Sequence, residues 1–309
     1  MDICITGGAG LVGQNLVQLL IERGYSRIAV LDKSANNLNI LKQLHLNIEA
    51  IHVDLSRAGA WQERLAKADV VVSLQAQIGG LDENEFRANN VIASRHICDA
   101  LKSSPNCYLV HISSSVLDSQ ATDFYTLTKT EQEDIFADLP QQKIILRPTL
   151  MFGWFDRKHL GWLSRFMGMS PIFPVPGSGR YLRQPLYARD FCRVIIASIE
   201  QRKQGGPYSI SGKERVTYID MIRCIRSVAG HFCMVVKLPY KVFYLLLKTY
   251  AFFDKNPPFT VSQLEALVID ELFAEADWET EFGVRATPFK EAVAETFTDP
   301  TFSNVVLEF

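Results

Sequence analysis

Two residues that could move a proton lie four positions apart in the sequence: Tyr125 and Lys129, in the run YTLTK. On a helix, side chains at this spacing share one face. A tyrosine with a pKa of about 10 is a poor base at neutral pH, and lowering that pKa by about three units takes roughly 4 kcal/mol. One ammonium about 4 Å away supplies about that much at an effective dielectric constant near 20. We therefore expect Lys129 to make Tyr125 a usable acid/base.

A glycine-rich run, TGGAGLVG, directly follows the first expected strand and opens the first expected helix. This is the context that a dinucleotide-binding motif requires. Gly7 permits a tight turn, Gly10 lets a pyrophosphate approach the backbone, and Gly13 lets the helix pack closely on the sheet. The helix N-terminus, which includes Leu11 and Val12, supplies free N–H groups and the positive end of the helix dipole. The run predicts a cofactor site.

Acidic residues end the second and third expected strands. Asp32 can accept hydrogen bonds from the ribose hydroxyls of adenosine and would repel a 2′-phosphate, which favours NAD over NADP, although the neighbouring Lys33 would soften that repulsion. Asp54 and Leu55 are placed to meet the adenine, and the alternative is that Asp54 caps the helix that follows. The other residues expected to line the cofactor site are Gln75, Ala76, Asn90, Tyr125, Lys129 and Pro148.

A run of three serines, Ser113, Ser114 and Ser115, ends the fifth expected strand, ten residues before Tyr125 when counted from the last of them. A serine hydroxyl at this position can hold the hydroxyl or carbonyl group of a substrate while a nicotinamide accepts or gives a hydride. Together with the Tyr/Lys pair, the run predicts a site for oxidation or reduction at a carbon that bears oxygen.

The hydrophobic pattern predicts the strands and helices that carry these residues. Up to about Pro148, short apolar runs alternate with amphipathic stretches, which is typical of βαβ units and a parallel sheet. We expect strands at residues 2–6, 27–31, 48–53, 69–74, 107–112 and 143–146. We expect helices near residues 11–23, 35–44, 58–67, 84–102 and 124–137. Right-handed crossovers then give an α/β fold with a doubly wound parallel sheet, the Rossmann fold, whose ligands lie beyond the carboxyl ends of the strands.

The chain divides into two expected parts. Residues 1–150 form an NAD-binding Rossmann domain, and residues 151–309 form a smaller substrate-binding lobe that is interleaved with the edge of the sheet. Within the lobe, helices are expected near residues 189–202 and 217–229.

One segment of the lobe, residues 239–253, is unusually aromatic (PYKVFYLLLKTYAFF). It is too short to cross a bilayer, and two lysines interrupt it. We favour a helix that packs on the lobe or over the substrate cleft, and contact with a membrane surface is the alternative.

Composition excludes several classes of protein. The 309 residues carry 32 Lys and Arg against 34 Asp and Glu, a formal net charge of -2, so we expect no nucleic-acid partner. The six cysteines show no Cys-x-x-Cys spacing, and we expect buried thiols in a reducing compartment and no metal site. Asp2 and the glycine-rich run stand where a signal peptide would need basic and apolar residues, so we expect a cytoplasmic protein.

Together these motifs resemble the extended short-chain dehydrogenase/reductase family, particularly its NAD-dependent epimerase/dehydratase branch. The resemblance covers nearly the whole chain and rests on TGGAGLVG, Asp32, Asp54-Leu55, the ANNV run at residues 88–91, the serine run, YTLTK and the LRPT run at residues 146–149. In the family, the asparagine that matches Asn90 helps to fix the active-site helix, and the Tyr/Lys pair that matches Tyr125 and Lys129 is catalytic. By the same match Ser114 is the catalytic hydroxyl, Ser115 is the alternative and a substrate contact, and the other serines would cap the strand end.

The resemblance also implies a substrate and an assembly. The expected reaction is 4-epimerisation or ketone reduction at a hydroxyl- or keto-bearing carbon of a nucleoside-diphosphate sugar. Arg183, in the run GSGRYLRQPLYARD, matches a family arginine that clamps the diphosphate, and a guanidinium grips phosphate oxygens well; a solvated surface arginine is the alternative. A homodimer is expected, because helices 84–102 and 124–137 match those that form a four-helix interface in the family.

The sequence departs from the family pattern after the serines. Only nine residues separate Ser115 from Tyr125, and Val-Leu-Asp stands where sugar-nucleotide enzymes have Val-Tyr-Gly at the start of a longer loop. The short loop is similar to the atypical branch of the family, which includes a cofactor-binding accessory subunit of respiratory complex I. A non-catalytic dinucleotide-binding subunit is therefore the alternative function. Dehydration is disfavoured, because only Asp118 and Asp123 could serve as its acid.

Overall fold

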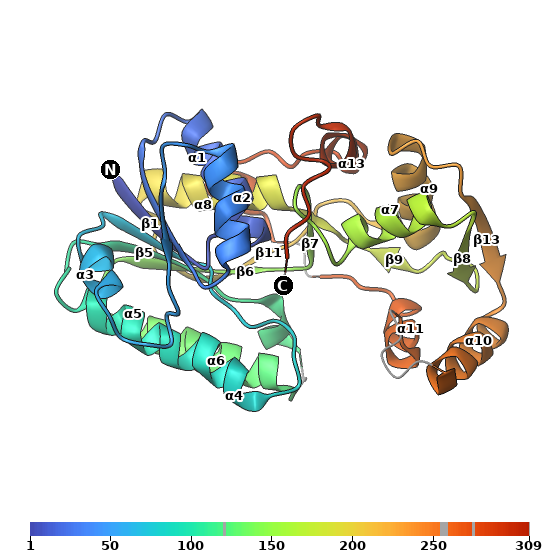
Figure 1. Ribbon diagram of the computed structural model, residues 1–309, viewed down its shortest axis with the longest axis horizontal. Coiled ribbons are helices and arrows are strands. Elements are labelled where there is room, and N and C mark those ends of the chain that lie inside the picture. The colour runs from blue at the N-terminus through green and yellow to red at the C-terminus, as the bar shows by residue number, and fades with distance from the viewer. Residues whose placement is uncertain (120–121, 254–258, 274–275, 309) are drawn as a thin grey trace.

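A seven-stranded parallel sheet forms the centre of the larger half of the molecule (Figure 1). The computed structural model describes residues 1–119, 122–253, 259–273 and 276–308. The strands of this sheet are β1 (Asp2–Thr6), β2 (Arg27–Asp32), β3 (Glu49–His52), β4 (Val70–Ser73), β5 (Tyr108–Ile112), β6 (Lys143–Pro148) and β11 (Gly205–Ile210). Their order, β11-β6-β5-β4-β1-β2-β3, runs outward from β1 in one direction and from β4 in the other, which confirms the doubly wound Rossmann-like fold.

Helices cover both faces of the sheet (Figure 1). One face carries α1 (Leu11–Glu22), α2 (Ala35–Leu44) and α8 (Ala188–Gln201), and the other carries α3 (Trp61–Ala66), α5 (Ala93–Leu101) and α6 (Phe124–Ala137). Strand β1 is buried at every position because both of its faces are covered. Its side chains alternate between the two cores: Ile3 and Ile5 pack toward α1, and Cys4 packs toward α5. All six cysteines are free thiols, and five of them are buried.

The region expected as one helix over residues 84–102 is built from three pieces. These are α4 (Glu83–Phe86), the π-helix η1 (Arg87–Ile92) and α5. A π-helical turn locally widens the helix and often lies at a functional site. Here it contains Asn90, whose side chain is fully buried.

The smaller lobe lies beyond the carboxyl ends of the strands (Figure 1). Its helices are α7 (Leu160–Met169), α9 (Tyr218–Val228), α10 (Tyr240–Phe253), α11 (Val261–Leu267) and α13 (Phe289–Thr298), and a short helix, α12 (Trp278–Phe282), packs near α8. Three two-stranded pairs join β7 (Met151–Phe152) with β10 (Leu186–Tyr187), β9 (Leu182–Arg183) with β12 (Val216–Thr217), and β8 (Ile172–Pro176) with β13 (Met234–Leu238). Because α8 and β11 come from the second half of the sequence, the lobe and the sheet are interleaved along the chain.

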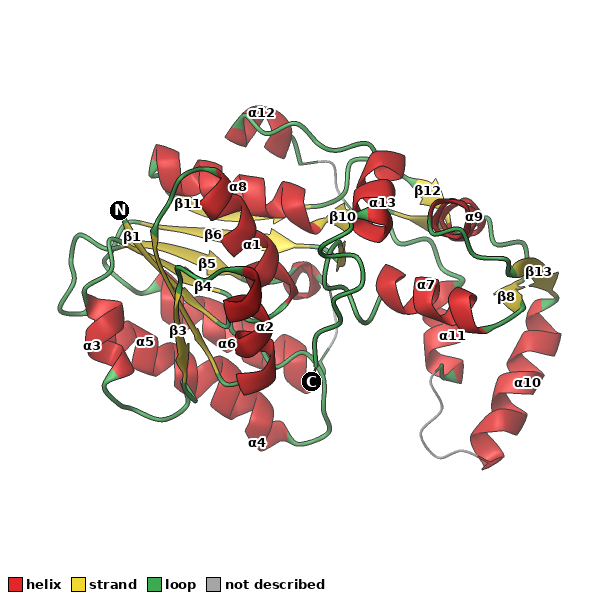
Figure 2. Cartoon of the chain, turned by 45° about the horizontal axis from the view of Figure 1, so that its top comes forward, coloured by secondary structure: helices red, strands yellow, loops and turns green. Residues whose placement is uncertain are grey.

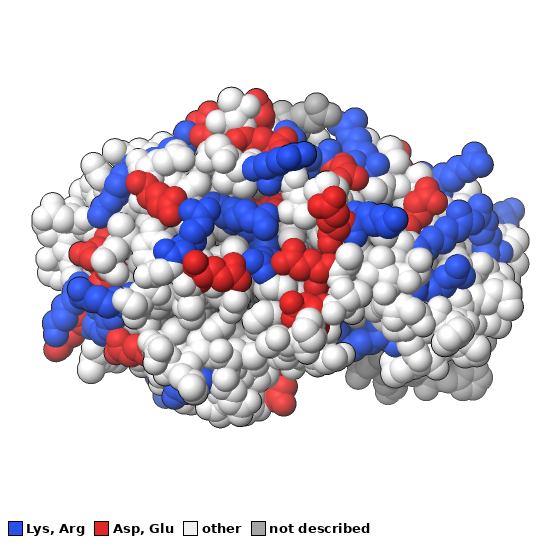
Figure 3. Space-filling view, turned by 90° about the horizontal axis from the view of Figure 1, so that it is seen from above, with Lys and Arg blue, Asp and Glu red and all other residues white. Residues whose placement is uncertain are grey.

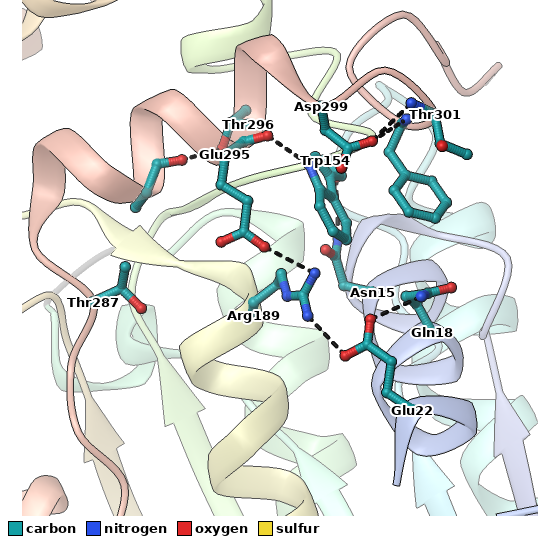
Figure 4. Close-up of polar contacts among 12 residues, drawn as sticks. Asn15, Gln18, Glu22, Trp154, Arg189, Thr287, Glu295, Thr296, Asp299 and Thr301 are labelled. Carbon is teal, nitrogen blue, oxygen red and sulfur yellow. Dashed lines mark hydrogen bonds and ion pairs between the residues drawn. The ribbon is translucent and has the colours of Figure 1, made fainter. Parts of the chain in front are cut away.

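Arg189 on α8 ties the end of the chain to the sheet domain (Figure 4). Its guanidinium donates to Glu22 on α1 and to Glu295 on α13, each at 2.9 Å, and lies 4.3 Å from the ring centre of Trp154. The segment that follows α13 then runs beside α2 (Figure 2), where the Asn37 side chain exchanges two hydrogen bonds with the backbone of Glu308, at 2.8 and 2.9 Å. No helix among the described residues is long and apolar enough to span a membrane.

Candidate active site

The glycine-rich turn has the geometry that the cofactor motif predicts. Gly7 has a φ angle of +68°, and a Cβ atom there would lie 2.5 Å from the backbone of Gln75. A Cβ atom on Gly13 would lie 2.2 Å from the carbonyl oxygen of Gly8, so only glycine allows α1 to sit this close to the turn. At Gly10 the nearest atom to an added Cβ is 3.7 Å away, which leaves space over the turn. Such a turn brings the backbone to the surface that a pyrophosphate needs.

The N-terminus of α1 is open to an anion. Within the described part of the chain, no side chain caps this helix, and no acidic residue lies in its first turn. Its first residues, Leu11 and Val12, are partly exposed. The unpaired N–H groups of a helix's first turn and the positive end of its dipole favour a phosphate there.

Asp32 is the last residue of β2, and its side chain forms a hydrogen bond with the glycine-rich turn. One carboxylate oxygen accepts from the Ala9 N–H and the other from the Ser34 N–H, each at 2.9 Å. Burial raises the pKa of Asp32, and these two hydrogen bonds oppose that rise. Since a carboxylate can accept about four hydrogen bonds, Asp32 keeps capacity for ribose hydroxyls. Lys33 is exposed beside it.

Asp54 makes local contacts after β3. Its carboxylate accepts from the N–H and the hydroxyl of Ser56, at 3.0 and 2.7 Å, and lies 3.6 Å from the guanidinium of Arg57. Partial burial tends to raise the pKa of Asp54, but the Ser56 hydrogen bonds and Arg57 lower it overall. Leu55 is buried in the core beneath. These contacts match the capping alternative, and the adenine contact stays a prediction.

Buried amides and hydroxyls link the strand ends to the helices below. The Gln75 side chain accepts from Thr6 at 2.6 Å and from Ser73 at 3.0 Å, and it donates to Ser94 on α5 at 3.3 Å. Gln75 is thus buried beneath the turn and held on three sides, whereas the next residue, Ala76, is exposed at the surface.

Asn90 joins the loop after β4 to α6. Its amide oxygen accepts from the Gln77 N–H at 2.6 Å, and its amide nitrogen donates to the Thr128 hydroxyl at 2.9 Å. Thr128 stands directly before Lys129 on α6. The contact is therefore of the kind that the expected role of Asn90, fixing the active-site helix, requires.

Tyr125 and Ser114 meet at the carboxyl end of β5. Burial raises the pKa of Tyr125, a hydrogen bond with Ser114 opposes the rise, and the Asp123 carboxylate adds to it. Ser114 also caps the short 3-10 helix η2 (Ser115–Asp118) through a 3.4 Å contact with the Val116 N–H. Ser115 is the first residue of η2 and is partly buried. The structure thus brings Ser114, the serine that we predicted, into contact with Tyr125.

Lys129 is buried under the site, with 1% of its surface exposed. Its ammonium donates to the Ile112 carbonyl oxygen at 2.9 Å and to the side-chain oxygen of Gln132. Burial lowers the pKa of Lys129 to about 7, against the influence of Glu133. Gln132 in turn donates to Ser94 at 2.9 Å.

These positions correct one expectation. We expected the Lys129 charge to lower the pKa of Tyr125, but that pKa is raised, because burial of the phenol dominates. The ammonium is turned instead to Ile112 and Gln132. Tyr125 is therefore protonated at neutral pH in this structure.

An ion-pair group that the motifs did not predict stabilises this site. Arg147 on β6 donates to both oxygens of Glu133, at 3.0 and 2.6 Å, and to Asp118 at 2.5 Å. It joins η2, which follows Ser114, to α6, which carries Tyr125. The sequence contains one indication of this group. Glu133 follows Lys129 by four residues, so both side chains lie on the inner face of the helix, where a carboxylate needs a cationic partner. Pro148, the next residue on β6, is buried at the strand end.

Both acids considered for a dehydratase are engaged elsewhere. Asp118 pairs with Arg147, and Asp123 caps α6 by accepting from the Thr126 N–H at 2.9 Å. No group of three or more His, Cys, Asp and Glu that could hold a metal ion occurs among the described residues.

Arg183 is used by the lobe itself. Its guanidinium donates to the carbonyl oxygens of Leu182 and Ile269, at 2.6 and 2.7 Å, and also to that of Leu267 at the end of α11. Glu271 lies 3.8 Å away, and only about a tenth of the side chain is exposed. This differs from both roles that we considered, a diphosphate clamp and a solvated surface arginine. The hydrogen bonds of Arg183 link β9 to the segment at the end of α11.

Residues 3–211 match the model of the NAD dependent epimerase/dehydratase family, and the chain belongs to that family. Its members are extended short-chain dehydrogenase/reductase enzymes, which confirms the resemblance inferred from the motifs.

Three similar proteins illustrate the range of the family. A low-salt glycan biosynthesis protein of Haloferax volcanii is 24% identical over 263 residues, which cover 74% of this chain and 83% of the relative. A ceramide reductase of Caulobacter vibrioides is 26% identical over 246 residues, with coverages of 77% and 73%. The crystal structure of a UDP-glucuronic acid 4-epimerase from Bacillus cereus in complex with NAD has a TM-score of 0.70, with 19% identity over 96% of this chain and 94% of that one. NAD is thus the cofactor of a solved neighbour, as expected here.

Proposed function

We propose that this protein is an NAD-dependent oxidoreductase or epimerase that acts at a hydroxyl- or keto-bearing carbon. The observation that carries the proposal is the contact of Ser114 with Tyr125 at the carboxyl end of β5. Lys129 is buried one helical turn further along α6, and the open N-terminus of α1 lies at the same edge of the sheet. Ser114 can hold a substrate oxygen by a hydrogen bond, and Tyr125 can transfer a proton to it.

The residues present fit NAD on structural grounds. The turn leaves space over Gly10, the first turn of α1 offers N–H groups, and Asp32 retains acceptor capacity for ribose. When bound, the nicotinamide supplies the site that accepts or gives a hydride. Asp32 favours NAD over NADP, because its carboxylate would repel a 2′-phosphate.

The chain's own groups divide the acid/base work. In the reductive direction the substrate carbon gains a hydride, its carbonyl oxygen takes the phenol proton of Tyr125, and a hydroxyl group results. Ser114 holds that oxygen by a hydrogen bond. A protonated Tyr125 is the form that this direction needs, and the raised pKa of Tyr125 supplies it at neutral pH. In the oxidative direction the same atoms move in reverse, and this step starts from Tyr125 without its phenol proton. A 4-epimerase uses both directions in turn, so it needs Tyr125 in each of its two protonation states.

We propose a nucleoside-diphosphate sugar as the substrate. The UDP-glucuronic acid 4-epimerase and the glycan biosynthesis protein support this choice. A second candidate, a ketone on a lipid, is favoured by Arg183, whose guanidinium is occupied by backbone carbonyl groups and not directed to a ligand. The ceramide reductase is the relative that supports it.

The experiment is a turnover screen of the purified protein. NAD and NADH are offered with UDP- and dTDP-sugars, their keto forms, and long-chain ketones in detergent, and the nucleotide absorbance and the products are followed. Turnover of a sugar nucleotide that Tyr125→Phe abolishes supports the proposal, and turnover of the long-chain ketone alone selects the second candidate. NAD binding without turnover of any member of the panel would contradict the proposal and favour an accessory subunit.

A further inference from the structure

Helix α10 turns an apolar face outward. Val242, Leu245 and Leu246 share one face at spacings of three and four residues, and their exposed fractions are 46%, 64% and 57%. Phe243 and Leu247 lie on another face and are half-buried. The Phe243 ring packs against that of Phe259, just before α11, with 6.3 Å between the ring centres. The interpretation that we favoured, a helix packed on the lobe, therefore holds for one face of α10 only.

A second apolar group lies on the neighbouring strand pair. Met234 on β13 is paired in register with Ile172 on β8, and both are exposed. Phe232, just before β13, is fully exposed, and Met169 at the end of α7 is nearly so. We call these four residues the strand patch. It and α10 lie at the end of the molecule furthest from the seven-stranded sheet (Figures 1 and 2).

The same end of the lobe is basic. Residues 221–253 contain five Lys and Arg residues and no Asp or Glu. Lys237, Lys241 and Lys248 are exposed. Lys241 and Lys248 are seven residues apart, so they stand on one side of α10, next to its apolar face. Seen from above, basic side chains outnumber acidic ones at the lobe end of the molecule (Figure 3).

We propose that this end of the lobe docks on the surface of an anionic phospholipid bilayer, with α10 lying in the plane of the headgroups. A helix with an outward apolar face bordered by lysines inserts its apolar side chains to the depth of the acyl boundary while its lysines meet lipid phosphates. The exposed Lys237, Lys241 and Lys248 favour this occupant, because an uncharged partner would gain nothing from three exposed cations. Docking leaves the seven-stranded sheet at the opposite end of the molecule from the bilayer (Figure 1), and it requires no particular reaction.

Sedimentation with vesicles tests the proposal. The full-length protein is mixed with vesicles of phosphatidylcholine alone or of phosphatidylcholine with phosphatidylglycerol, at low and high salt. We expect binding to the anionic vesicles that salt weakens, and little binding to the neutral ones. Equal binding to both, or binding to neither, would overturn the proposal.

Paired variants identify the surface. We expect Leu245→Glu with Leu246→Glu to abolish vesicle binding, whereas Leu46→Glu, at an exposed leucine of the sheet domain, leaves it unchanged. Lys241→Gln with Lys248→Gln should weaken binding by roughly fivefold per lysine. Circular dichroism and NAD affinity check that each variant is folded. Wild-type binding by either α10 variant would show that another surface meets the lipid and would overturn the assignment.

A second copy of the chain is the competing occupant. If α10 forms an interface between copies, light scattering will show an oligomer that Leu245→Glu dissociates, and the vesicles will not sediment the wild type. That result would replace the bilayer with a protein partner.

Discussion

Lys129 provides a quantitative test of the buried site. Its pKa falls from the ordinary value of 10.5 to about 7 because the ammonium is removed from water. The unfolded chain therefore binds more protons than the folded protein between about pH 7 and 10.5, and stability attributable to Lys129 rises with pH across that window. Below pH 7 the full cost of burying the charge is present, and above 10.5 it is absent.

We expect Lys129→Met to be more stable than the wild type at pH 7, by an amount that shrinks as the pH rises. With the two pKa values given, the free energy difference between variant and wild type should fall by about 3 kcal/mol from about pH 7 to about pH 9.5. Methionine keeps the length and the apolar stem. The hydrogen bonds to Ile112 and Gln132 that it loses reduce the gain by a similar amount at each pH, so the change with pH carries the test.

The assay is urea unfolding without added nucleotide over this pH range. Lys67→Met is the matched control, because Lys67 is exposed; it should follow the wild type at every pH. If the Lys129→Met and wild-type curves ran parallel, Lys129 would ionise with an ordinary pKa, and the reasoning from its burial would be refuted.

Three further predictions concern the cofactor, the ion-pair group of Arg147 and the assembly. NAD should bind more tightly than NADP, and Asp32→Ala should reduce the ratio of the two dissociation constants, measured by titration of both cofactors. Equal or tighter binding of NADP by the wild type would show that Lys33 has more influence than Asp32. Arg147→Met should lower the free energy of unfolding by about 3 kcal/mol, because it leaves the buried carboxylate of Glu133 without its partner. Arg95→Met, at an exposed ion pair, should lower it by less than about 1 kcal/mol. Equal losses of stability for the two variants in urea unfolding would contradict this prediction. Light scattering at micromolar concentration should show a homodimer, and a monomer would end that prediction.

Local patterns predicted most of the sheet. The six strands expected from apolar runs lie within two residues of β1 to β6. Strands such as β1 and β4 are buried on both faces and therefore have a continuous apolar sequence, whereas the edge strand β3 is only partly buried. The seventh strand, β11, was not predicted. It begins with Gly205, Gly206 and Pro207, residue types that are typical of turns, and it is a strand because β6 offers it an edge.

The polar site depended on contacts that no local pattern contains. Spacing placed Tyr125 and Lys129 on one helix, but the direction of the ammonium is set by the Ile112 carbonyl on β5 and by Gln132. Arg183 matched a ligand-binding motif, yet its partners, Leu267 and Ile269, are more than eighty residues away in sequence. A motif therefore predicted which residues gather at the strand ends, while the packing of distant segments decided which partner each residue has.

The most direct test of the central claim is the turnover rate of Tyr125→Phe, measured together with its affinity for NAD on a substrate that the screen has identified. The variant removes the hydroxyl that transfers the proton and keeps the aromatic ring, so it deletes an interaction of the transition state and little ground-state binding. We predict a loss of roughly a hundred- to ten-thousand-fold in rate, with NAD affinity changed by no more than a few fold. A variant that kept more than about a tenth of the wild-type rate would contradict the account, because Tyr125 would then not be the acid/base.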